Sequence, residues 1–314
     1  MKHLIGARLM AAVPVLMLVS VGAFAMVHLT PGTPAELILG EAATPERVAA
    51  LNTELGYSDP LPTQFGRWWA GLLRGDLGTS LYSSRSITEQ ILERLPVTMA
   101  LAIGSILLVT LLGTVAGGIS AVRPGSRIDK AVSAVSMTAL AIPSFFFGLL
   151  LLYGFAVELG WFPVAGYKKF SQSPSAWALS LVLPVLAIAL HGMASVAKQA
   201  RTALLEVLDR PFVQAARARG LSPRRVLWRH AWPSAAPPVL SVLGLSFAGM
   251  IGGAVVIENV FSLPGLGSYV VTATLRRDLP AVQGVVIVTT LVVLATNLII
   301  DVVQVLLDPR VKAG

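Results

Sequence analysis

The segment Val97–Ala121 reads VTMALAIGSILLVTLLGTVAGGISA and contains no charged side chain. About 20 apolar residues in a helix are enough to cross the hydrocarbon core of a bilayer, and this run exceeds that length. A strand of a membrane barrel is about half as long and alternates apolar with polar residues, which this run does not do. The segment therefore predicts a transmembrane helix.

Apolar runs of this kind fill most of the chain. The 314 residues are 55% hydrophobic and 13% charged, with a mean hydropathy of +0.75. A soluble domain would carry about twice that charged share. We therefore expect an all-α integral membrane protein with six transmembrane helices. Their predicted ranges are Leu9–Leu29, Val97–Ala121, Ala131–Val157, Trp177–Ala197, Val239–Ile257 and Val282–Leu306.

The distribution of lysine and arginine predicts the orientation of these helices. Fifteen basic residues lie in the N-terminus, the loops 123–130 and 198–235 and the C-terminal tail, against nine in the segments 31–96, 158–178 and 258–282. Five of the nine lie in the long segment 31–96, where the positive-inside rule has little force. Both termini are therefore expected in the cytoplasm. The net charge of +8 reflects this orientation rather than binding to nucleic acid.

The first helix could instead be a secretory signal peptide, because Lys2 and Arg8 begin the chain and Ala23-Phe24-Ala25 resembles a cleavage site. Its apolar run is longer than a usual signal core, so we expect a retained helix. The predicted organisation is an N-terminal cytoplasmic tip with the first helix at 1–30, an extracytoplasmic segment at 31–96, a membrane core at 97–307 that includes the loop 198–235, and a cytoplasmic tail at 308–314.

The segment 31–96 is the only large part expected outside the bilayer. It carries eight acidic and five basic residues. Thr44-Pro45-Glu46 has the pattern of a helix start, with a capping residue, a proline at the first helical position and an early acid. Gly75–Ser80 reads as a turn. We favour a cap packed over the helix bundle; a docking surface for an external partner is the alternative.

The loop 198–235 holds the most informative motif. Residues Gln214–Gly220 read QAARARG, and the alanines predict a narrow helix that can enter a groove of another protein. Gly220 suits a left-handed C-terminal cap, and Ser222 with Pro223 predicts the start of a second helix. The loop carries eight basic and two acidic residues. An amphipathic loop on anionic lipid is therefore the alternative to a protein-docking loop.

No catalytic or metal-binding pattern is found in the sequence. The chain has no cysteine and no Gly-Lys pair, so it lacks a P-loop for ATP, and its four histidines are scattered. His191, Glu258, Asn297 and Asp301 stand near the ends of spans, where interfacial positions or interhelical hydrogen bonds explain them more simply than substrate binding.

Prolines and glycines inside the spans carry local expectations. Pro143 and Pro184 each remove a backbone hydrogen bond, and each can bend its helix. The glycines of Gly113–Gly118 and Gly244–Gly253 are expected to allow close contact between helices.

The loop motif resembles a known family. Gln214-Ala215-Ala216, three residues, Gly220, nine residues and His230-Ala231-Trp232-Pro233 follow the spacing E-A-A-x3-G-x9-I-x-L-P of the EAA loop in permease subunits of ATP-binding-cassette importers. Gln, His and Trp replace the Glu, Ile and Leu of that pattern. Motifs similar to the dipeptide/oligopeptide branch follow in order: Pro31–Ala35, Gly75–Ser80, Ala141–Phe145, Gly252–Glu258, Phe261–Gly267 and Leu306–Arg310.

This resemblance implies a type I importer permease fold, with a large extracytoplasmic loop after the first helix, in a bacterial inner membrane. It implies a B-type subunit that pairs with a C-type permease, one or two cytoplasmic ATPases and an extracytoplasmic solute-binding protein. ATP and Mg would be bound by the ATPases and no cofactor by this chain. The ATPase-coupling residues that it implies are Gln214, Ala215, Ala216, Arg217, Arg219, Gly220 and Leu221.

The substrate is open at this point. Di- and oligopeptides are the first expectation, and nickel, glutathione and haem-like compounds occur within the same family. An ion-coupled secondary transporter is the rival from another class, and it predicts buried acidic or histidine residues in the middle of spans. The middles of the six apolar runs lack them. A membrane-bound enzyme is the third possibility and lacks a catalytic constellation.

Overall fold

The computed structural model of the chain describes residues 2–29 and 32–307. The expected tail at 308–314 and the motif Asp308-Pro309-Arg310 lie outside the described residues. Helix is the dominant structure, and the described residues contain no β-sheet beyond an isolated bridge between Thr79 and Ser86. The expected all-α fold is confirmed.

Five helices of the described chain are long and apolar enough to cross a bilayer. They are α1 (Lys2–Leu29), the continuous rod of α5 (Ile87–Leu108), η2 (Val109–Gly113) and α6 (Thr114–Val122), then α9 (Pro174–Leu208), the rod of α11 (Pro223–Arg225), η4 (Val226–Ala231) and α12 (Trp232–Val260), and α14 (Leu279–Leu307). Each contains one of the predicted spans.

The sixth span is broken rather than continuous. Helix α7 (Arg127–Ala141) and the helix formed by α8 (Ser144–Leu151) and η3 (Leu152–Glu158) meet at an angle of 103°. Ile142 adopts extended backbone angles, φ −83° and ψ 123°, because the ring of Pro143 disfavours the helical region for the residue before it. The prediction of a single helix over Ala131–Val157 is therefore corrected. Pro184 lies inside α9 without interrupting it.

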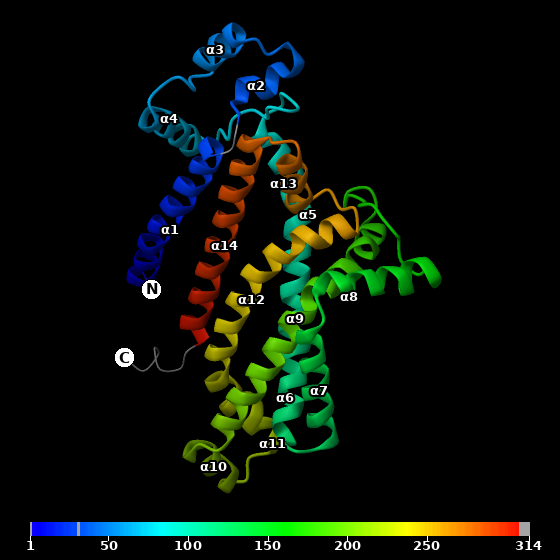
Figure 1. Cartoon of the computed structure of the whole chain (residues 1–314). Helices are drawn as coiled ribbons and strands as arrows, with labels where there is room; N and C mark the ends of the chain where they lie inside the picture. The colour runs from blue at the N-terminus through cyan, green and yellow to red at the C-terminus, as the bar shows by residue number, and fades with distance from the viewer. Residues whose placement is uncertain (1, 30–31, 308–314) are drawn as a thin grey trace.

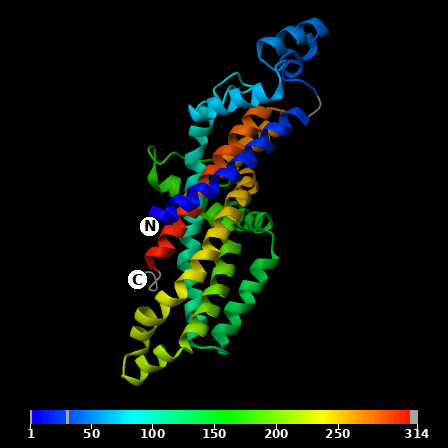
Figure 2. The same cartoon turned by 90° about the vertical axis from the view of Figure 1, so that its left-hand side faces the viewer.

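Helix α9 is at the centre of the bundle. It contacts α5, α6, α7, α8 and α12, whereas α1 and α14 pair along one edge (Figures 1 and 2). Gly113 and Gly117 allow this packing, because a methyl group at Gly113 would lie 2.8 Å from Val196 and one at Gly117 would lie 2.7 Å from the Ala200 methyl. The prediction of close contact is confirmed for these glycines.

In α12, a methyl group at Gly244 would lie 3.5 Å from Asn297 of α14, but three other glycines behave differently. Gly249, Gly252 and Gly253 have open space where a side chain would stand, so they do not serve packing within this chain. At these three positions the described residues make no close contact, so the prediction stays open for a partner chain.

The segment after α1 folds into short helices at one end of the molecule. These are α2 (Pro34–Leu39), η1 (Gly40–Ala42), α3 (Pro45–Glu54) and α4 (Leu61–Leu73). The predicted start of α3 is confirmed, because the Thr44 hydroxyl accepts a hydrogen bond from the backbone N–H of Arg47. The short helix α13 (Leu266–Leu275) lies near this end, and α10 (Pro211–Ala218) lies at the opposite end (Figure 1).

Candidate functional site

The predicted coupling loop contains a hairpin between α9 and the rod that begins with α11. Helix α9 continues to Leu208, and the next rod begins at Pro223, so only residues 209–222 form the projecting turn. The predicted loop 198–235 is helical on both sides of this turn. Figures 1 and 2 show α10 beyond the ends of α1 and α14. The ion pair between Arg8 and Asp301, at 3.0 Å, joins α1 and α14 at the ends that lie nearest the chain termini.

Local sequence signals set the shape of this hairpin. Pro211 occupies the first turn of α10, and Gly220 follows it with φ +76°, the left-handed conformation expected there. The Gly220 N–H donates to the Arg217 carbonyl at 2.9 Å. The next helix begins at Pro223 as predicted, but the Ser222 hydroxyl makes no capping hydrogen bond.

The two faces of α10 have different surroundings. Val213 and Ala216 are buried, at 0% and 6% exposure, in the same apolar cluster as Val207 and Val226. The other predicted coupling residues are exposed except Leu221, which is half-buried: Gln214, Ala215, Arg217, Arg219 and Gly220. The expectation that a partner's groove encloses Ala216 is therefore corrected, because its own chain already encloses it.

The exposed surface of the hairpin is basic and free of internal pairing. Within the described residues, no carboxylate pairs with Arg217, Arg219, Arg224, Arg225 or Arg229. Phe212 and Trp228 are 45% and 57% exposed beside them. Unpaired guanidinium groups next to exposed aromatic rings form a surface suited to a partner with acidic and apolar groups.

An ion pair that sequence reasoning missed stabilises the base of this region. Asp129 of α7 accepts hydrogen bonds from Nε and Nη2 of Arg201 on α9, at 2.6 and 2.8 Å. The Ser120 hydroxyl and the Gly125 N–H complete the carboxylate's partners. A bidentate pair of this kind fixes orientation as well as distance. The two partners stand 72 positions apart, so no local pattern announces the contact.

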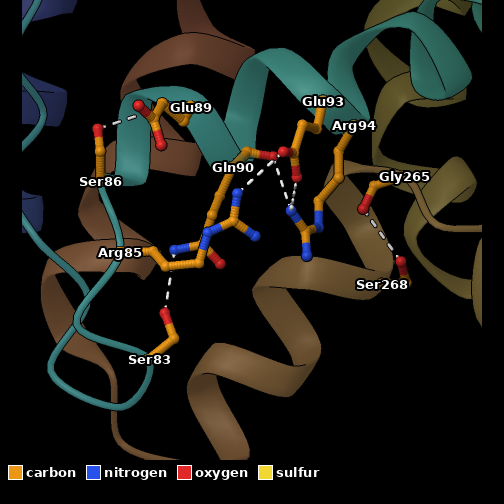
Figure 3. A network of polar contacts seen from close by, with 9 residues as sticks. All are labelled: Ser83, Arg85, Ser86, Glu89, Gln90, Glu93, Arg94, Gly265 and Ser268. Carbon is orange, nitrogen blue, oxygen red and sulfur yellow. Dashed lines mark hydrogen bonds and ion pairs between the residues drawn. The ribbon is translucent and has the colours of Figure 1, made fainter.

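A second polar cluster lies at the opposite end, where α5 begins (Figure 3). Arg85 pairs with Glu93 at 2.9 Å, and the hydrogen bond and charge of Glu93 raise the pKa of the Arg85 guanidinium. Arg94 donates to the carbonyl of Gln90 at 2.8 Å, and the Gln90 side chain donates to Ser83 at 3.2 Å. The sequence offered no motif for this cluster.

Polar residues of the spans are engaged in contacts between helices. Glu258 is fully buried and accepts a hydrogen bond from Thr98 at 2.6 Å, and Asp301 pairs with Arg8. The explanation by interhelical bonding is confirmed for these two. His191 lies at the middle of α9 rather than near a span end, which corrects its placement. No three metal-ligating side chains gather within 2–29 and 32–307.

Two family descriptions match the chain in succession. Residues 1–102 match the N-terminal part of the binding-protein-dependent transport system membrane component, and residues 113–313 match the binding-protein-dependent transport system inner membrane component. Together they cover almost the whole length.

Named relatives are similar along their full length. A protein of Brucella abortus named as a peptide transport system permease is 39% identical over 99% of both chains. A di/tripeptide transport system permease protein of Pseudomonas aeruginosa is 34% identical over 99% of both chains. An oligopeptide transport system permease protein of Bacillus subtilis is 32% identical over 97% of this chain and 98% of its own.

Solved structures share the fold of the membrane core. The MetNI methionine ABC transporter has a chain that matches with a TM-score of 0.51 and 20% identity, over 71% of this chain and 95% of its own. An amino acid ABC transporter matches with a TM-score of 0.50 and 18% identity, over 71% and 94%. The expected importer permease fold is thereby confirmed.

Proposed function

The chain belongs to the family of inner membrane components of binding-protein-dependent transport systems, and from this premise we propose that it is the permease subunit of an ATP-driven importer of di- or oligopeptides. The observation that carries the peptide substrate is similarity over the full length to three permeases named for peptide transport. The chain is a transport component, and the energy-yielding chemistry belongs to a partner.

The α10 hairpin is the proposed contact with a cytoplasmic ATPase. It projects beyond the bundle, its arginines have no carboxylate partner within the described chain, and its narrow helix is held rigidly by Val213 and Ala216. A rigid hairpin is needed because a flexible loop would not transmit the motion of an ATPase to the transmembrane helices. ATP and Mg would be bound by the ATPase. The hairpin end would then face the cytoplasm, as would both termini, in a bacterial inner membrane.

A second permease is the proposed partner of α12. Leu245, Ala248, Gly249, Gly252 and Val256 are exposed at spacings of three and four residues, so they form one stripe along that helix. Small residues let two helix backbones approach closely in lipid. An extracytoplasmic solute-binding protein would dock at the opposite end, where α2, α3 and α4 lie.

Reconstitution tests the proposed function. Proteoliposomes that contain this chain, the second permease, the ATPases and the binding protein should accumulate a radiolabelled tripeptide only with ATP inside. The purified chain alone should hydrolyse no ATP, since it has no P-loop. Accumulation of nickel, glutathione or a haem-like compound in place of the peptide would reassign the substrate. ATP hydrolysis by the pure chain would overturn the subunit assignment.

A further inference from the structure

A small pocket opens beside the cluster of Figure 3. Its volume is about 250 Å³, and it lies between the loop 80–83, the first turns of α5, and α13 with the turn that follows it. Its polar lining comes from Ser80, Tyr82, Ser83, Gln90, Arg94, Ser268, Tyr269, Thr272, Arg276 and Asp278. Ligand sites that hold a whole small molecule usually measure about 300 Å³ or more, so this pocket suits one end of a larger ligand.

Tyr269, which helps to line this pocket, carries an unsatisfied hydroxyl. Tyr269 is 8% exposed, and its hydroxyl is buried without any hydrogen-bond partner. Burial raises the pKa of this hydroxyl, so it keeps its proton and remains a donor. A buried donor without a partner costs free energy, and native proteins rarely tolerate one. A ligand oxygen in the pocket would satisfy it.

Both arginines of the pocket stack on aromatic rings, and Arg94 also pairs with Glu93 at 3.8 Å. The Arg276 guanidinium lies 3.8 Å from the centroid of the Tyr82 ring, and the Arg94 guanidinium lies 4.4 Å from that of Tyr269. Stacking on a ring orients a guanidinium while leaving its N–H donors at the edge available. Within the described residues, no carboxylate pairs with Arg276.

The one carboxylate that lines the pocket is already occupied. Asp278 is 3% exposed, and it accepts hydrogen bonds from the Ser80 hydroxyl and from the N–H of Leu81. These neutral donors stabilise the loop 80–83, and Asp278 makes no ion pair with an arginine within the described residues. Arg276 is therefore the guanidinium of the pocket that has no carboxylate partner, and it favours a ligand with a carboxylate.

We propose that this pocket binds the C-terminal carboxylate of the peptide that the importer carries, with Arg276 as the cationic partner and Tyr269 as a hydrogen-bond donor. This assignment rests on the proposed function. A carboxylate presents two oxygens in a plane, which matches the paired N–H groups of a guanidinium. The pocket admits the last residue of a peptide, and the rest of the chain extends out of it, so peptides of different length share one site.

Ser268 connects the pocket with the packing of the spans. It lines the pocket, and its backbone N–H donates to Oε2 of Glu258 at 2.9 Å. Glu258 in turn bonds Thr98 of α5. A ligand that draws α13 toward α5 therefore acts on three elements that meet at one buried carboxyl group.

The test uses the complete importer in proteoliposomes, with trialanine and trialanine amide as probes. Arg276→Gln should raise the trialanine concentration for half-maximal uptake about tenfold, because a charge-assisted hydrogen bond is lost, and should change it less than twofold for the amide. Tyr269→Phe should raise it about threefold for the acid alone. Arg74→Gln is the matched control, since it removes an exposed arginine at the end of α4 outside the pocket.

A second measurement is independent of transport rate. Alanyl-p-benzoylphenylalanine, irradiated with the wild-type complex, should label the segment 264–278 as the free acid and not as the amide, and Arg276→Gln should abolish the label. Equal losses for acid and amide in uptake, or labelling by both forms, would refute the carboxylate site. If Arg276→Gln instead lowers the affinity for the binding protein tenfold and leaves the preference for the acid unchanged, the pocket serves protein docking. That outcome would also refute the carboxylate site.

These outcomes separate the two proposals. If the wild-type complex accumulates neither probe, the proposed function fails. If it accumulates trialanine and Arg276→Gln behaves as Arg74→Gln does, only the pocket assignment fails.

Discussion

The Thr98 hydroxyl of α5 donates a 2.6 Å hydrogen bond to Oε1 of Glu258 on α12, and both side chains are buried. The same hydroxyl accepts the N–H of Leu266 at 2.8 Å, and the second carboxyl oxygen accepts the N–H of Ser268 at 2.9 Å. Two residues 160 positions apart thus join three helices through one polar node. Such a node fixes register, because apolar contacts alone allow helices in lipid to slide.

Thr98→Val should lower the thermal stability of the purified chain. The substitution keeps the shape but leaves a carboxyl oxygen and a backbone N–H without partners, which costs about 1–3 kcal/mol for each buried group. Size-exclusion chromatography after heating in detergent measures the loss. Thr98→Ser keeps the hydroxyl and should behave as wild type; equal stability of the valine and serine variants would contradict the role of the node.

Gly267→Ala should destabilise the same region by a steric route. A methyl group at Gly267 would meet the backbone of Val255 and lie 2.8 Å from Oε2 of Glu258. Backbone cannot move aside cheaply, so α13 must shift away from α12. Gly22→Ala in α1 is the control, since no atom lies within 4 Å of the added methyl group there, and alanine in an open helix position stabilises by up to about 1 kcal/mol. The same melting assay should therefore give shifts of opposite sign, and a neutral Gly267→Ala would contradict the packing.

Much of this architecture follows from the sequence, and the misplaced boundaries have a physical cause. The predicted fourth span ended at Ala197 because Lys198 and Arg201 follow it. In the structure, α9 continues for three more turns, since Ala200 and Leu204 keep one face buried and Arg201 pairs with Asp129. Charge ends an apolar run, but it does not end a helix whose charged groups find partners.

The prolines inside the spans show that local sequence does not decide whether a helix continues. Pro143 breaks its span and Pro184 does not, although both lie inside apolar runs. Proline removes one backbone hydrogen bond in each case, and the surrounding helices decide whether the chain bends there. Because α9 is held by neighbours over its whole length, Pro184 is accommodated within a continuous helix.

The candidate sites also contain some features that local sequence predicts and others that it does not. Local signals predicted the turn at Gly220 and the start at Pro223, because capping depends on a few neighbouring residues. The pocket of Tyr82, Arg94 and Arg276 could not be predicted, since its parts come from segments almost 200 positions apart. The inward position of Ala216 depends on packing against the neighbouring elements α9 and η4, which the sequence of α10 alone does not reveal.

Arg201→Gln should loosen the junction of α7 and α9. It leaves the buried Asp129 carboxylate with only the Ser120 hydroxyl and N–H donors, and an ion without its partner destabilises a buried site. The expected result is a lower melting temperature, partly restored in the double variant with Asp129→Asn, because the amide carries no charge. If the melting temperature of the double variant falls by the sum of the decreases in the two single variants, the residues do not act as a pair.

Single introduced cysteines should report the orientation, since the chain contains no cysteine of its own. Ser58, Ser83 and Ser222 are all exposed, so each replacement is accessible to a maleimide. We expect the cysteines at 58 and 83 to react in intact cells and the one at 222 only after permeabilisation. Reversed labelling would place α10 outside the cell and remove the ATPase contact.

The α10 hairpin gives the sharpest test, because two adjacent alanines have different surroundings: Ala215 is exposed and Ala216 is buried. Ala216→Arg places a charge in the buried cluster and should unfold the hairpin, at a cost of several kcal/mol, whether or not a partner exists. Ala215→Arg changes only the exposed face, so the purified chain should melt as wild type does. If an ATPase groove receives α10, Ala215→Arg should nevertheless abolish peptide uptake and cross-linking from position 215 to the ATPase. Gly220→Val should abolish both as well, since a β-branched residue is strained at φ +76°. A hairpin that rests on anionic lipid predicts the reverse for Ala215→Arg, because one more arginine would strengthen that contact. Normal uptake by a stable Ala215→Arg variant would therefore exclude the ATPase groove.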